Sequence, residues 1–155
     1  MSATAPQPSN SDSSSSSIAI RQARDEDATA IRLLVTQALL AADLDVPTAE
    51  ADTDLIETGY YREPGRGMWV AVEDERIIGC AAIDLGEDGH ATLRRLAGVS
   101  LANLTAAAVA FSQGRGYRGV ETVLPTAMTE AREAVTAEGF LNDATANDLL
   151  FRRTL

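Results

Sequence analysis

A backbone site for an anion is the first chemistry that the sequence suggests, and it lies between Gly98 and Asn103, where a predicted strand meets a predicted helix. Ser100 is a favourable N-cap residue, because its hydroxyl can accept a hydrogen bond from an unpaired amide of the first helical turn. The amides of Leu101, Ala102 and Asn103 then lie at the positive end of the helix dipole. We expect a ligand to bind where this strand ends and this helix begins.

Two side chains with catalytic potential occur once each, His90 and Cys80. An imidazole titrates near neutral pH, so His90 could act as a general base, although a position at the start of a strand also suits a surface histidine. A nucleophilic cysteine needs a nearby cation or helix start that lowers the pKa of its thiol, and the small neighbours of Cys80 supply neither. We predict a surface histidine, a buried core cysteine and, without a Cys/His cluster of suitable spacing, no metal site.

Three elements must position the residues around Gly98: a strand over 90–98, a helix over 100–113 and a strand over 120–124. Alternation in the first strand predicts one face with Ala91, Leu93 and Arg95 and the opposite face with Thr92, Arg94 and Leu96. The helix has an apolar stripe at Leu101, Leu104, Ala108 and Phe111, and it ends near Gly114 and Gly116. Such a strand–helix–strand unit of about thirty residues predicts that its two strands are parallel.

The other segments predict the rest of one domain over 18–155. A strand over 18–23 precedes a helix whose start is acidic and whose apolar face begins at Ala28. A second helical stretch follows over 47–59, and a polar hairpin turn joins strands over 68–72 and 77–85. The last helix is expected over 128–138, with Thr126 or Thr129 as its cap, and the last strand over 149–155. Residues 1–17, which contain five consecutive serines, are predicted to be disordered.

Five segments in the same order resemble the GCN5-related N-acetyltransferase (GNAT) family. The first is the opening strand with the helix start at 18–27, and the second and third are the two strands of the central hairpin at 69–73 and 76–83. The fourth is the helix-to-strand passage at 110–120, and the fifth is the last helix with its exit at 124–128 and 137–140. The resemblance covers nearly all of residues 18–155. It implies an α/β (α+β) fold with a central mixed, mostly antiparallel twisted sheet of six to seven strands, flanked by about four helices.

The chain departs from the family's pattern at three places. The family usually has an Arg/Gln-x-x-Gly-x-Gly/Ala loop whose amides hold the pyrophosphate of coenzyme A. Here Val99 and Ser100 lead directly into the helix, so this loop is shortened or missing by about seven residues. Many relatives also carry a tyrosine on the last helix that protonates the departing thiolate, and Val135 stands there. Thr92 stands where some relatives have a glutamate base.

The resemblance implies transfer of an acetyl group from acetyl-CoA to a primary amine of a small molecule or protein. Cofactor binding is then expected at the end of the strand and the start of the helix. A backbone amide within residues 97–99 is expected to be the oxyanion donor. The predicted cofactor-binding residues are Ala97, Gly98, Val99, Ser100, Leu101, Ala102 and Asn103. The alternative is a catalytically degraded GNAT-fold protein that acts as a binding or dimerisation module, or the product of a decaying gene.

The resemblance also places the acceptor pocket near the segment between the first two strands. Tyr60 and Tyr61, together with Arg62 and Arg66, could receive an anionic or aromatic substrate there. Proton transfer would then involve water or one of the two tyrosines, which are the candidate catalytic residues. The alternative is a loop in which one tyrosine packs inward and the arginines face water.

The composition limits the classes of partner. The formal charge is −10 at pH 7, and all 13 basic residues are arginines. An acidic surface disfavours nucleic acid, and no apolar run approaches the ~20 residues that span a bilayer. Without a secretory pattern, and with one cysteine, we expect a cytoplasmic protein whose partners are its substrates and, in a homodimer, a second copy. The acidic, lysine-free composition fits a halophilic source, and an acidic bias of GC-rich coding is the alternative.

Overall fold

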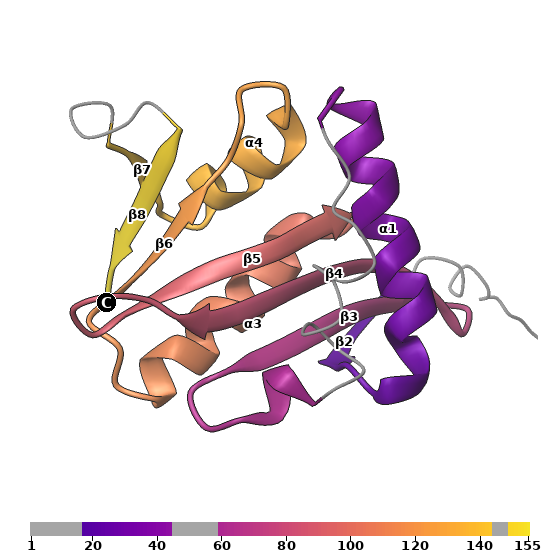
Figure 1. The fold of residues 1–155 in the computed structure, drawn as a ribbon, viewed down its shortest axis with the longest axis horizontal. Helices are drawn as coiled ribbons and strands as arrows, with labels where there is room; N and C mark the ends of the chain where they lie inside the picture. Colours follow the sequence, from indigo (N-terminus) through magenta and orange to yellow (C-terminus); the bar gives the residue numbers. More distant parts are fainter. Residues whose placement is uncertain (1–16, 45–58, 144–148) are drawn as a thin grey trace, which may run out of the picture.

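The computed structural model describes residues 17–44, 59–143 and 149–155, which form a seven-stranded sheet in the order β2-β3-β4-β5-β6-β8-β7 (Figure 1). The strands are β2 (Ala19–Gln22), β3 (Gly67–Glu73), β4 (Arg76–Leu85), β5 (His90–Gly98), β6 (Gly119–Val123), β7 (Leu141–Asn142) and β8 (Leu150–Thr154). Neighbouring strands are antiparallel except for β5 and β6, which are parallel as predicted. The predicted mixed, mostly antiparallel sheet is confirmed.

Three α-helices cover the sheet in the described part of the chain. They are α1 (Ala28–Ala41), α3 (Leu101–Gly114) and α4 (Thr129–Ala137), and two short 3-10 helices, η2 (Asp25–Asp27) and η3 (Tyr60–Arg62), accompany them. This is slightly fewer than the four predicted helices. The helical stretch predicted over 47–59 lies outside the described residues, except for Gly59, which precedes η3. None of the described helices is long and apolar enough to cross a membrane.

The core consists of two clusters on opposite faces of the sheet (Figure 1). The larger cluster packs under α3 and α4 and includes Leu93, Leu104 and Val135. The smaller cluster packs under α1 and includes Ile31 and Cys80. Cys80 is fully buried, as predicted, and this burial raises the pKa of its thiol to about 12. Such a thiol is protonated at neutral pH and is not a nucleophile.

A bulge in β5 changes the predicted faces of this strand. Ala82 is opposite Arg94 and Cys80 is opposite Ala97, so β5 has one more residue than β4 between these pairs. Arg95 has a positive φ of 57° at this point. As a result, Leu96 lies in the same cluster as Leu93, and the prediction that it shares a face with Arg94 is wrong. Strict alternation holds only while a strand has no inserted residue.

The caps of α3 and α4 also differ from those predicted. Ser100 precedes α3 but has a left-handed backbone with φ of 63°, and its hydroxyl accepts no hydrogen bond from the first-turn amides. Instead, Asn103 Nδ2 donates to Ser100 Oγ over 3.1 Å. Met128 is the N-cap residue of α4, without a side-chain hydrogen bond, so neither Thr126 nor Thr129 is its cap. Both helices therefore depend on packing rather than on side-chain capping.

Candidate active site in the split between β5 and β6

The two parallel strands separate shortly after they begin. They pair at His90–Gly119, Ala91–Val120 and Thr92–Glu121, and the ladder ends there. Thr122 Oγ1 then donates to Leu93 O over 2.9 Å, which is the last direct link between the strands. Beyond it β5 runs toward α1 while β6 runs toward α4 (Figure 1).

A cavity of about 470 Å³ fills the split. Its lining residues come from the end of α1, from β5 beyond its first residues, from the end of β6 and from the segment before α4. They are Val35, Ala38, Leu39, Leu44, Thr92, Leu93, Arg94, Arg95, Leu96, Ala97, Thr122, Val123, Leu124, Pro125 and Met128. Most are apolar, and the charged residues among them are both arginines. The cavity can therefore hold an apolar group next to a cationic wall.

Asp84 organises the polar residues beside this wall. It accepts hydrogen bonds from Tyr60 Oη at 2.7 Å, Arg66 Nε at 2.9 Å, the Leu85 amide at 2.7 Å and Arg94 Nη1 at 2.8 Å. Burial alone would raise the pKa of the Asp84 carboxyl, but these donors outweigh it and lower that pKa. Asp84 therefore stays ionised at neutral pH and holds one side of the Arg94 guanidinium.

The two candidate catalytic tyrosines lie next to this cluster, with their rings edge to face and 4.9 Å apart. Neither lines the cavity in the split. The hydrogen bond from Tyr60 to Asp84 raises the pKa of that phenol. Tyr61 is 6% exposed, its hydroxyl has no partner within the described ranges, and burial raises its pKa to about 12. Tyr61 thus matches the expected inward-packed tyrosine.

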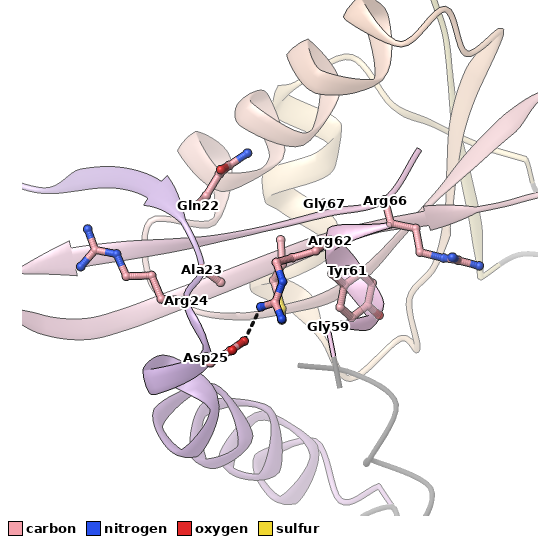
Figure 2. A pocket seen from close by; sticks show the side chains of 10 residues that line it. Gln22, Ala23, Arg24, Asp25, Gly59, Tyr61, Arg62, Arg66 and Gly67 are labelled. Atoms are coloured by element: carbon pink, nitrogen blue, oxygen red, sulfur yellow. Dashed lines mark hydrogen bonds and ion pairs between the residues drawn. The ribbon is translucent and has the colours of Figure 1, made fainter. Parts of the chain in front are cut away.

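The two arginines that were predicted to act with these tyrosines both line a smaller pocket of about 290 Å³, and so does Tyr61. Arg62 is exposed and forms an ion pair there with Asp25. Figure 2 shows Arg66 extending away from that ion pair. Its guanidinium pairs with Asp84 and lies 4.4 Å from the centre of the Tyr60 ring. Both arginines are therefore engaged in internal contacts.

The predicted cofactor-binding residues lie at the outer end of β5. Residues Gly98 to Ala102 line a shallow hollow of about 390 Å³, Ala97 lines the cavity instead, and the Asn103 side chain turns toward Ser100. The first helical bond of α3 is that from the Leu104 amide to Ser100 O, at 3.0 Å. The three amides before it thus remain for a ligand.

Two carboxylates of α4, Glu130 and Glu133, also line the outer hollow. Sequence reasoning did not find them, although the apolar face predicted for the last helix places these residues off that face. Which part of the molecule they would face depends on how α4 packs against α3. No sequence pattern contains this information.

The backbone amides near Gly98 point in different directions. The Val99 amide donates to Ile78 O of β4 over 2.9 Å. Successive amides of a strand point to opposite edges, so the Gly98 amide points toward the edge from which β6 has separated. Of the residues expected to supply an oxyanion donor, Gly98 is therefore one whose amide points away from β4, and Gly98 itself lines the outer hollow.

Comparison with known proteins identifies this architecture. No protein-family model matches the sequence, and no curated protein sequence matches it. Solved structures do match, including a GNAT-family acetyltransferase from Staphylococcus aureus Mu50, with a TM-score of 0.75 and 11% identity over 90% of this chain and 99% of that one. The chain has the GNAT fold. The resemblance predicted from the sequence is therefore confirmed at the level of the fold.

Two further GNAT-fold structures extend the comparison. An acetyltransferase from Streptococcus agalactiae has a TM-score of 0.75 and 17% identity, over 89% of this chain and 98% of that one. A GNAT-family acetyltransferase from Brucella melitensis, solved in complex with acetyl-CoA, has a TM-score of 0.64 and 16% identity, over 90% of this chain and 88% of that one. Whole-chain coverage at such low identity shows that the sheet and its helices are shared, while the site residues must be judged individually.

Proposed function

We propose that this protein transfers an acetyl group from acetyl-CoA to a primary amine of a small molecule or a protein. The observation that carries the proposal is the cavity in the β5–β6 split, which Ala97 lines one residue before the end of β5 at Gly98, in a chain with the GNAT fold. A GNAT-fold relative solved with acetyl-CoA supports the choice of donor.

The inner cavity fits the acyl end of this cofactor. Its lining is mostly apolar, and the β5 edge that faces the split has no strand paired to it beyond Thr92. An amide-containing arm could therefore pair with the β5 edge while its apolar part is shielded from water. Ala97 and Gly98 are the residues that would hold the arm at its inner end.

The outer hollow fits the diphosphate less well. The Leu101, Ala102 and Asn103 amides suit an anion, but the hollow contains the Glu130 and Glu133 carboxylates, and none of the described residues that line it is basic. Repulsion from these carboxylates weakens cofactor binding at low ionic strength, and salt screens it. We therefore expect acetyl-CoA to bind more tightly as the salt concentration rises.

When bound, acetyl-CoA supplies the activated acetyl carbonyl and a thiolate leaving group. We infer that the Gly98 amide donates to the negative charge that develops on the carbonyl oxygen, a role that any residue's backbone could fill. Tyr60 and Tyr61 are poor bases at neutral pH, because the pKa of each phenol is raised. We therefore propose that water removes the proton of the amine and that solvent protonates the thiolate.

Release of free thiol from acetyl-CoA, measured with a panel of primary amines in dilute buffer and in molar KCl, tests the proposal. We expect amine-dependent release that is faster in KCl, with an amine-free reaction as the control for hydrolysis. If no amine increases release, and calorimetry detects no heat with millimolar acetyl-CoA in molar KCl, the enzymatic proposal is wrong. The remaining function would be that of a non-catalytic binding or dimerisation module.

A further inference from the structure

The charge of the inner cavity is opposite to that of the whole protein. The chain has 23 acidic and 13 basic residues, yet the residues that line the cavity in the described structure include Arg94 and Arg95 and no carboxylate. In an acidic protein, a guanidinium such as that of Arg94 at this wall attracts an anionic group into the split.

Arg94 is held in a fixed orientation at the cavity wall. Its Nη1 donates to Asp84, which is fixed in turn by Tyr60, Arg66 and the Leu85 amide. A guanidinium has five N–H donors in a rigid fork, and the Arg94 side chain is 37% exposed, so donors remain for a second carboxylate. Because Arg66 also neutralises Asp84, the charge of Arg94 is not used up within the cluster.

The rest of the cavity lining is largely apolar. It includes Val35 and Leu39 of α1 and Leu124 and Met128, which precede α4. A ligand that satisfies both the guanidinium and this apolar lining has a carboxylate at one end and an apolar body of a few carbon atoms.

We propose that the acceptor is an α-amino acid with an apolar side chain, whose carboxylate binds Arg94 and whose side chain packs between α1 and the segment before α4. This inference rests on the proposed acetyl transfer and names its acceptor class. In the reaction, the amine nitrogen forms a bond to the acetyl carbon and the carbon–sulfur bond breaks. The amine loses one proton to solvent, and the thiolate takes one from solvent, so the products are an N-acetyl amino acid and a free thiol.

Direct binding tests the inference without requiring turnover. Calorimetry on the full chain compares N-acetyl-L-leucine with N-acetyl-L-leucinamide, which lacks the carboxylate charge and is otherwise closely matched. We expect the carboxylate form to bind about 10- to 100-fold more tightly, as for a hydrogen bond to a charged group. Equal affinities, or tighter binding of the amide, would overturn the inference. This test uses the unaltered protein and needs no variant.

Variants assign the effect to Arg94. Arg94→Gln should abolish the preference for the carboxylate, and Arg94→Lys, which keeps the charge without the fork, should retain part of it. Arg76→Gln, at the exposed first position of β4, removes the same charge away from the cavity and should leave the preference unchanged. A full preference in a folded Arg94→Gln protein would refute the assignment. The assignment would also be refuted if the Arg94→Gln protein lost affinity for coenzyme A but kept its affinity for N-acetyl-L-leucine.

Turnover separates this inference from the proposed function. With acetyl-CoA, L-leucine should release thiol at a higher kcat/KM than L-leucinamide, although the amine of leucinamide is less basic and more often unprotonated. If leucinamide is the better substrate, acetyl transfer stands and the carboxylate inference fails. If other amines of the panel react and L-leucine does not, acetyl transfer stands and this inference fails. If no amine of the panel reacts but the binding preference persists, the carboxylate site stands and the transferase proposal fails.

Discussion

The inner cavity and the outer hollow are lined by successive residues of the same strand, β5, yet they carry opposite charges. Arg94 and Arg95 belong to the wall of the cavity, and Glu130 and Glu133 face the hollow. A diphosphate-containing donor requires cations, or at least no carboxylates, at the outer position. The cavity and the hollow therefore favour ligand groups of different charge, although they adjoin the same strand.

This difference has a consequence for the working conditions of the protein. Two carboxylates at the mouth repel an anionic cofactor at low ionic strength, whereas in ~1 M salt the screening length falls to about 3 Å. The inner arginines are partly shielded from solvent by the protein, so their attraction for a carboxylate is screened less. High salt would therefore restore the outer position without abolishing the inner one, in agreement with the halophilic source predicted from the composition.

The largest effect is expected when the inner cavity is filled. Ala38 of α1 lines the cavity, and Ala38→Trp should reduce thiol release at least about 100-fold, because displaced reactants lose their alignment. Gln37→Trp puts the same side chain on an exposed position of α1 and should leave the rate nearly unchanged. Unchanged turnover in a correctly folded Ala38→Trp protein would mean that the reaction does not take place in the inner cavity.

Removal of the Asp84 carboxylate should have the next largest effect. Its pKa is lower in the folded than in the unfolded state, so its contribution to stability is present above the unfolded pKa and is lost as pH falls through the folded pKa, below about pH 4. Asp84→Asn should lower the free energy of unfolding by about 2 kcal/mol at pH 7 and flatten its decline in acid. Urea unfolding measures both.

The matched control is Asp25→Asn, which breaks the exposed ion pair with Arg62. Exposed pairs contribute less than about 1 kcal/mol, so this variant should differ little from the unaltered protein. If Asp84→Asn is equally mild, Asp84 does not fix the cationic wall of the cavity.

The outer hollow can be tested by removing its charges. Glu130→Gln combined with Glu133→Gln should tighten acetyl-CoA binding about tenfold in dilute buffer, because the two carboxylates near the surface together contribute on the order of 1.4 kcal/mol of repulsion. The gain should disappear in molar KCl. A double variant with the same charge change at exposed turns, Glu75→Gln and Glu87→Gln, is the control. Titration calorimetry at two salt concentrations would reveal equal gains in both proteins if the effect were only one of net charge.

The smallest effect is expected at Tyr61. Its buried hydroxyl has no partner in the described structure, so Tyr61→Phe should stabilise the fold slightly, by up to about 1 kcal/mol, and should leave thiol release unchanged. Tyr60→Phe, which removes a hydrogen bond to Asp84, should instead destabilise it. A large loss of activity in Tyr61→Phe, with stability retained, would make this phenol a catalytic group and move the reaction toward the smaller pocket.

Local sequence patterns were sufficient to predict the elements around the split. The strand over 90–98, the helix after it and the strand from residue 120 follow from alternation, helical spacing and glycines, and their order predicts the parallel pair. The bulge at Arg95 was not predictable, because Arg94, Arg95 and Leu96 fit either face until the pairing with β4 is known. Thus Leu96 was assigned to the wrong face.

The site depends more on contacts between distant segments. Tyr60, Arg66 and Arg94 meet at Asp84 because η3, β4 and β5 come together, and no spacing in the sequence encodes that meeting. The role of Tyr60 and Tyr61, and cofactor binding by residues 97–103, remain predictions that the variants above can test. Val135, where relatives carry a tyrosine, is fully buried in the larger core cluster, so its substitution by a polar residue would disturb packing.

The two-residue link between β5 and α3 offers a route for protein engineering. Gly98 and Ser100 both have left-handed backbones, and Val99 between them is more than half exposed, so the connection is already turned outward from the sheet. Lengthening a surface connection costs little, about 0.6 kcal/mol for each doubling of its length. A glycine-rich segment inserted after Val99 would thus add backbone amides next to the start of α3 without redesign of the scaffold.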